Sequence, residues 1–285
     1  MATGARVKTP ETFVHAFICT ACGTQYPPAD APPTTCAICE DERQFVPSSG
    51  QGWTTQEKLA VEHFNAWREH EPGVIGIGTQ PSFAIGQRAL LLRTAHGNVL
   101  WDCISLLDAA TVTLIKALGG VQAMAISHPH FYTAMAEWGS TFGVPVHLHA
   151  ADQRRIMRPD PMLRLWEGET LRLLPDVTVI RGGGHFPGSS MLHWAKGAEG
   201  RGILCSSDTA FVAADRKSLS FMRSYPNLIP LPRREVDAIA EALALFEFDR
   251  IYGIRFDSVI PTGAKQALQA SVARYLSATE PCDGG

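Results

Sequence analysis

Metal-binding side chains follow short apolar runs at several places in this sequence. His128 and His130 come directly after the run from Val121 to Ile126, and Asp208 follows a second apolar stretch. His185 stands behind three consecutive glycines, where the backbone can turn sharply and approach an ion closely. Apolar runs of this length are typical of buried strands, so these side chains are expected at strand ends. The four residues together predict one metal site.

Four cysteines near the N-terminus form a second pattern, Cys-x2-Cys-x13-Cys-x2-Cys. Its ligands would be Cys19, Cys22, Cys36 and Cys39. The segment is rich in proline and poor in large apolar side chains, so it cannot build a core unaided. Four thiolates at this spacing are the usual ligands of a structural zinc ion, and paired cysteines in a chain without an export signal favour metal over disulfides. We expect residues 1–48 to form a zinc ribbon, although four thiolates accept iron as well.

The rest of the chain predicts a layered α/β domain. Residues 49–72 are interpreted as a linker and a helix over Gln56 to Glu69, and residues 73–285 as the main domain. Strands are expected at residues 82–85, 89–93, 99–101, 121–126, 144–148, 171–174, 177–180, 191–194, 203–205 and 250–254, and helices at residues 109–118, 133–142, 152–157, 234–245 and 265–276. Two successive blocks of strands that each finish in helices favour a sandwich.

Composition limits the partners. The chain has 285 residues, of which 45% are hydrophobic and 19% charged, as in ordinary globular proteins. A net charge of -3 gives no reason to expect nucleic acid. No apolar run reaches the roughly 20 residues of a membrane span, and no signal peptide is recognisable. We expect a cytoplasmic protein that binds a small-molecule substrate and has no membrane partner, and the sequence leaves a homo-oligomer open.

The order of these residues resembles that of the metallo-β-lactamase superfamily, over roughly Gly73 to Ala278. The family signature His-x-His-x-Asp-His, a later histidine behind a glycine and a bridging aspartate match His128, His130, His185 and Asp208. The resemblance implies an αββα sandwich. It also implies that Asp102, at the end of an early strand, orients a ligand histidine.

The sequence departs from that signature where a second metal would bind. Tyr132 and Thr133 stand in place of the signature's aspartate and second histidine, and the segment around Arg255 lacks the family's late histidine. A phenol and a hydroxyl are poor substitutes for a carboxylate and an imidazole. We therefore expect a single ion, zinc or iron, in the main domain and another in the ribbon.

A single-metal site predicts a hydrolase of a small ester, thioester, lactone or amide. In this hypothesis Asp208 is both ligand and proton acceptor, Tyr132 donates to the oxyanion, and His149 shuttles protons. Two alternatives stay open. One is a mononuclear non-haem iron oxygenase acting on a sulfur compound, and the other is a binding module whose active site has decayed.

Overall fold

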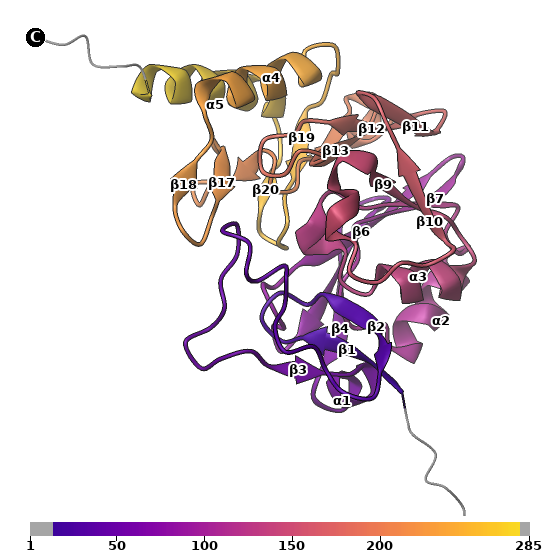
Figure 1. The fold of residues 1–285 in the computed structure, drawn as a ribbon. Helices are drawn as coiled ribbons and strands as arrows, with labels where there is room; N and C mark the ends of the chain where they lie inside the picture. The colour runs from indigo at the N-terminus through magenta and orange to yellow at the C-terminus, as the bar shows by residue number, and fades with distance from the viewer. Residues whose placement is uncertain (1–13, 280–285) are drawn as a thin grey trace, which may run out of the picture.

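Two mixed β-sheets face each other in the computed structural model, which describes residues 14–279 (Figure 1). The seven-stranded sheet has the spatial order β10 (Leu163–Trp166), β9 (Val146–His149), β8 (Ala123–Ala125), β7 (Gly97–Trp101), β6 (Arg88–Thr94), β5 (Val74–Gln80) and β4 (Phe64–Glu71). The six-stranded sheet has the order β11 (Thr170–Leu174), β12 (Val177–Arg181), β13 (Ser190–Trp194), β14 (Ile203–Cys205), β19 (Arg250–Tyr252) and β20 (Val259–Ile260). Strands β7 to β10 are parallel, as are β14 and β19, and the remaining neighbours in the two sheets are antiparallel.

Helices cover the outer face of each sheet. Helices α2 (Ala109–Ala117) and α3 (Met135–Phe142) contribute to the core on the seven-stranded sheet, and α4 (Arg233–Leu243) and α5 (Ala264–Ala278) to the core on the six-stranded sheet. A third core lies between the sheets, where Leu92 and Trp101 meet Leu192 and Trp194. The predicted αββα sandwich is therefore confirmed.

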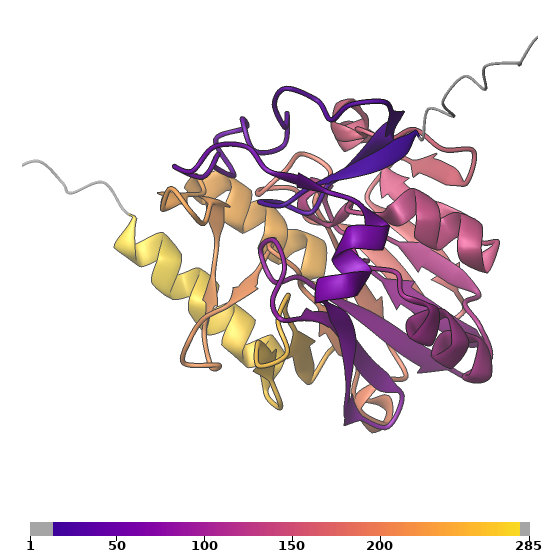
Figure 2. The ribbon, with the colours of Figure 1, turned by 90° about the horizontal axis from the view of Figure 1, so that it is seen from below.

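The N-terminal segment, indigo in Figures 1 and 2, lies against one edge of the sandwich. It consists of the three-stranded antiparallel sheet β2 (Gln25–Ala29), β1 (His15–Cys19) and β3 (Trp53–Thr54), followed by α1 (Gln56–Glu62). The division into residues 1–48, 49–72 and 73–285 stays a prediction, and residues 1–13 and 280–285 lie outside the described part.

The helix predicted for Gln56 to Glu69 is too long and is corrected here. It ends at Glu62, because His63 adopts an extended conformation, and Phe64–Glu71 then pairs with β5 as the edge strand β4. Hydrogen bonds to a neighbouring strand outweigh the local helical preference. The strand expected at residues 82–85 is also wrong: Ala84 and Gly86 have positive φ angles, and the strand lies earlier, at β5.

Short elements complete the described part of the chain. They are the hairpins β15 (Phe211–Val212) with β16 (Leu219–Ser220) and β17 (Met222–Ser224) with β18 (Ile229–Pro230), and the 3-10 turns at Pro129–Phe131, Ala150–Arg155 and Ala198–Gly200.

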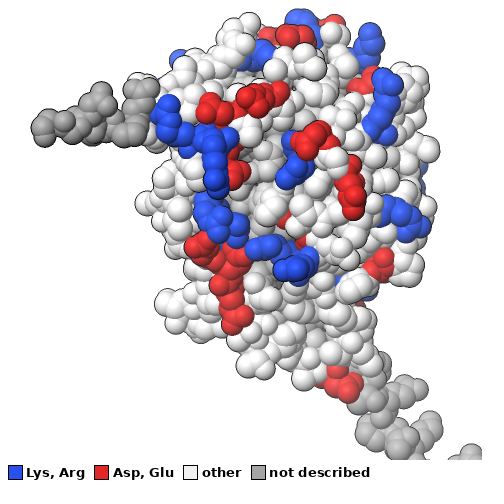
Figure 3. Space-filling model, turned by 45° about the horizontal axis from the view of Figure 1, so that its top comes forward, with Lys and Arg blue, Asp and Glu red and all other residues white. Residues whose placement is uncertain are grey.

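No helix in the described part of the chain is both long and apolar enough to span a bilayer. Basic and acidic side chains are interspersed on the face shown in Figure 3. The absence of a nucleic-acid partner stays a prediction.

Candidate metal centres

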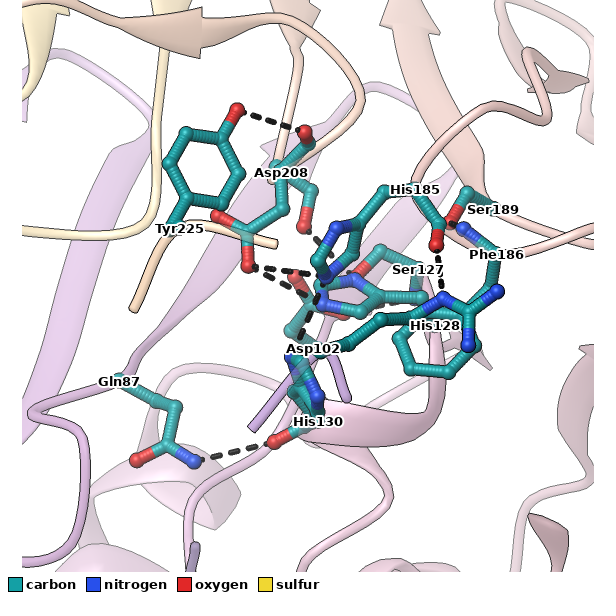
Figure 4. Close-up of polar contacts among 12 residues, drawn as sticks. Gln87, Asp102, Ser127, His128, His130, His185, Phe186, Ser189, Asp208 and Tyr225 are labelled. Atoms are coloured by element: carbon teal, nitrogen blue, oxygen red, sulfur yellow. Dashed lines mark hydrogen bonds and ion pairs between the residues drawn. The ribbon is translucent and has the colours of Figure 1, made fainter. Parts of the chain in front are cut away.

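His128, His130, His185 and Asp208 meet at one edge of the sandwich (Figure 4). They follow the carboxyl ends of β8, β12 and β14, and one ligand atom from each lies within 4.8 Å of the others. The His128 Nε2 atom is 3.2 Å from Asp208 Oδ2, and the His185 Nε2 atom is 3.3 Å from His130 Nδ1. All four side chains are buried. The predicted grouping is therefore present in the fold.

The glycines before His185 are required by the local backbone. Gly183 and Gly184 have φ angles of 65° and 73°, which side chains other than glycine rarely adopt. A Cβ atom on Gly184 would also lie 2.7 Å from a methyl group of Leu231. These two glycines let the chain leave β12 and bring His185 to the other ligands.

Hydrogen bonds fix which ring nitrogen faces the cluster. His185 Nδ1 lies 3.2 Å from the carbonyl oxygen of Met222, so it carries the proton and leaves Nε2 free for an ion. His128 Nδ1 lies 2.9 Å from the hydroxyl of Ser127 and 3.2 Å from that of Ser207, so its Nε2 also faces inward. The rings are thus held in the orientation that metal coordination needs.

The protonation states suit a cation. Burial and the charge of His128 lower the pKa of His185 to about 4, and burial together with His185 lowers the pKa of His130 well below its usual value. Burial opposes ionisation of Asp208, but the contact with His128 and the charges of His128 and His185 lower its pKa. His130 and His185 as neutral imidazoles and Asp208 as a carboxylate are in the forms that bind metal. Asp208 Oδ1 is buried without a hydrogen-bond partner among the described residues, as expected for an atom that an ion would satisfy.

Three further predicted residues lie around this site in different ways. Asp102 is buried, which raises its pKa to about 7, and its Oδ1 accepts a 2.7 Å hydrogen bond from the backbone N–H of Ser127, next to His128. Tyr132 packs in the core under the seven-stranded sheet and does not line the cavity. Both ring nitrogens of His149 contact backbone groups, at 3.1 Å and 3.2 Å. Asp102 therefore contacts the segment that carries His128, whereas Tyr132 and His149 do not line the cavity, and the role of each stays a prediction.

A cavity of about 540 Å³ opens onto the cluster. His130, His185 and Asp208 line it, whereas His128 lies behind them. The other lining residues come from distant parts of the chain: Ala21, Arg43, Gln44, Phe45, Ala84, Ile85, Phe211, Tyr225, Pro226, Ile254 and Arg255. A metal held by the four ligands would therefore be open to this cavity.

The four predicted ribbon cysteines also meet. Their sulfur atoms form a second group within 4.8 Å, with Cys19 3.6 Å from Cys39 and Cys22 3.6 Å from Cys36. A zinc–sulfur bond of about 2.3 Å predicts an edge of about 3.8 Å for a tetrahedron of four thiolates. All four thiols are buried and free of disulfides. The residues therefore fit a tetrahedral ion, and two candidate metal sites are present.

Residues from elsewhere in the chain also pack against the ligands, and the sequence analysis assigned none of them a role. Tyr225 donates a 3.0 Å hydrogen bond from its hydroxyl to the backbone oxygen of Asp208. Tyr225 lies in a segment after Asp208 that is rich in aromatic residues, and this composition is the one sequence signal for its role. Arg43 and Gln87 carry no such signal, because their contacts depend on how the ribbon packs against the sandwich.

Comparison with solved structures defines the class of fold. The metallo-β-lactamase FIM-1 from Pseudomonas aeruginosa, in its mono-zinc form, superposes with a TM-score of 0.55 at 13% identity over 76% of this chain and 97% of its own. VMB-1 superposes with a TM-score of 0.57 at 11% identity over 76% of this chain and 98% of its own. At this identity the likeness shows the fold alone, and the chain has the metallo-β-lactamase fold.

One curated protein shows a closer relationship in sequence. The uncharacterized protein YmaE of Bacillus subtilis (strain 168) is 44% identical over 264 residues, which cover 92% of this chain and 96% of YmaE. The chain belongs to the family of YmaE. No family model matches it.

Proposed function

We propose that this protein is a metal-dependent hydrolase with a single-ion active site. The observation that carries the proposal is the convergence of three imidazoles and one carboxylate at the floor of an open cavity. His128, His130, His185 and Asp208 would hold the ion. An ion in such a site lowers the pKa of a bound water and polarises a carbonyl, which is the chemistry that hydrolysis of an ester, thioester, lactone or amide needs.

The surroundings favour one ion rather than two. Tyr132, at the position of the signature's aspartate, is buried in the core, and the Thr133 hydroxyl lies 3.0 Å from the Cys103 sulfur. Within residues 14–279 the only groups of three or more histidine, cysteine or acidic side chains that could share an ion are the four cysteines and the four ligands above. The mono-zinc form of FIM-1 shows that a protein of this fold can be isolated with one zinc.

The chain's own residues would position the reacting groups. Asp208, ionised and with Oδ1 unpaired, is the candidate proton acceptor as well as a ligand. Tyr225 holds the Asp208 backbone, and burial raises the pKa of its hydroxyl so that it remains a donor. Tyr225 rather than Tyr132 therefore lines the cavity, where its hydroxyl proton is used on the Asp208 backbone.

The cavity walls favour a small substrate with an apolar body and a negatively charged end. Phe45, Ile85, Phe211 and Ile254 supply apolar surface. Arg255 is exposed, lines the same cavity and lowers the pKa of Asp208 through its charge. Its side chain has no ion pair or hydrogen bond among the described residues, so the guanidinium is available for a carboxylate or phosphate.

A second candidate function rests on the closeness of the four-cysteine site. Four thiolates also hold iron, and histidines with a carboxylate are the ligands of non-haem iron oxygenases. Zinc in both sites would exclude oxygenase chemistry, and iron in both would favour it. A decayed binding module is the third reading, and it predicts that no substrate is turned over.

The test is an assay of the zinc-loaded protein on matched esters, thioesters, lactones and amides. His185→Ala should lower kcat/KM by at least about a hundredfold, because loss of a ligand removes several kcal/mol of electrophilic stabilisation. His96→Ala is the control, since His96 is exposed in the turn between β6 and β7. Equal activities of wild type and His185→Ala on every substrate would refute the proposal.

A further inference from the structure

One buried side chain joins the two candidate metal sites. Gln87, in the loop before β6, donates from Nε2 to the carbonyl oxygen of Cys22 at 2.9 Å and to that of His130 at 3.0 Å. Both partners are acceptors, so the two amide protons of Gln87 are both used. Figure 4 shows the bond to His130. Cys22 is a ligand of the ribbon site and His130 a ligand of the main site.

Arg43 forms a second link between the ribbon and the main site. Its Nε donates to the backbone oxygen of His185 at 2.6 Å, and its guanidinium lies 4.6 Å from the centre of the Phe186 ring. Asp41 pairs with Arg43 and with Arg155, each at 2.7 Å, and Arg155 also lies over Phe186. The Phe186 ring packs in turn against all three ligand histidines.

The ribbon has a small interior of its own, although further hydrogen bonds join it to the sandwich, such as those from Gln25 to Glu137 and from Ser105 to Gly23. Its core consists of the four cysteines and Ile38, with a few half-buried neighbours. Residues 36–52 form no helix or strand. Segments of this kind depend on their ion for structure. Ala21, Arg43, Gln44 and Phe45 of the ribbon also line the cavity, so the ribbon forms one wall of the active site.

We infer that the ion in the four-cysteine site controls the affinity of the main site for its own ion. Gln87 and Arg43 are the positioning residues: they fix the backbone of His130 and His185 only while the ribbon is folded around its ion. Partners that hydrogen-bond to the ligand side chains are worth about 10–100-fold in metal affinity, and we expect the lower end of that range for contacts to the ligands' backbone. The inference concerns binding of the two ions and holds whichever reaction the main site performs.

The experiment measures the Zn²⁺ affinity of the main site in the full-length protein by competition with a chelator. Cys36→Ser/Cys39→Ser, which empties the ribbon, should weaken that affinity about tenfold or more. Gln87→Met should do the same with all eight ligands intact. Gln122→Met, at an exposed glutamine before β8, should leave the affinity unchanged. A variant that combines Cys36→Ser/Cys39→Ser with Gln87→Met should lose much less binding free energy for Zn²⁺ at the main site than the sum of the two separate losses. The reason is that both changes break the same link between the two sites.

Main-site affinities within twofold of wild type in the ribbon variant and in Gln87→Met would overturn the inference. Circular dichroism checks that each variant is folded. Arg43→Lys, which keeps the charge but loses the Nε donor, gives an independent measurement if either of the other variants does not fold. Its affinity should also fall, and an unchanged value would count against the coupling.

Discussion

The two metal sites differ in how they are enclosed and in how far apart their ligands lie in the sequence. The ribbon cysteines span residues 19–39 and are all buried, and Gln51 and Tyr26 donate to the sulfur atoms of Cys19 and Cys36. The main-site ligands span residues 128–208, and three of the four line a cavity. Closed sets of four thiolates are typical of structural ions, and open mixed sets of catalytic ones. The comparison teaches that an ion in the ribbon would be enclosed by its ligands, whereas an ion in the main site would be open to the cavity.

The largest expected effect is on the stability of the ribbon when one of its cysteine ligands is removed. Cys36→Ser should unfold the ribbon, because metal binding to structural sites contributes about 10–16 kcal/mol to folding of small domains. Limited proteolysis should then cut within residues 36–52, which have no regular structure of their own. Cys103→Ser is the control, since Cys103 lies in the main core and in neither metal site. If Cys36→Ser resisted the protease as well as wild type does, the four-cysteine site would not be a structural metal site.

A smaller effect tests how the backbone presents His185. Gly184→Ala should destabilise the protein by about 2–4 kcal/mol, because a positive φ costs about 1 kcal/mol and the overlap with Leu231 adds about 1–3 kcal/mol. Gly143→Ala isolates the first contribution, since its φ is also positive and its Cβ would meet nothing. Denaturant unfolding measures both. Equal losses at the two positions would show that packing behind His185 does not matter.

The smallest expected effect concerns substrate recognition by Arg255 at the open main site. Arg255→Ala should raise KM about tenfold, or about 1.4 kcal/mol, for a substrate carrying a carboxylate, and should leave an uncharged ester of the same acyl group unaffected. Arg255→Lys should keep part of the preference, because the charge remains while the bidentate geometry is lost. Steady-state kinetics on the substrate pair provides the readout. An equal change for both substrates would remove Arg255 from substrate recognition.

The ligands were predictable from the sequence because each follows its own strand or glycine turn. His128 and Asp208 are far apart in the chain, yet their apolar runs place both at the carboxyl ends of strands on the same edge. The ribbon was predictable because its ligand spacing is local. The resemblance to a known family supplied the αββα order, which alternation of apolar residues alone does not determine.

The parts that escaped prediction depend on tertiary contacts. Strand β4 forms because β5 offers it hydrogen bonds, so its residues give no decisive local signal. Tyr225 reaches Asp208 from the hairpin of β17 and β18, whereas Tyr132, adjacent to the motif, turns into the core. Gln87 acts through the carbonyls of Cys22 and His130, which any residue type would present.

The most direct test of the account counts the ions in the purified, metal-replete protein by elemental analysis. We predict two ions per chain in the wild type and one in His185→Ala, with the remaining ion held by the cysteines. Three ions per chain in the wild type would contradict the single-ion main site, and so would two retained by His185→Ala.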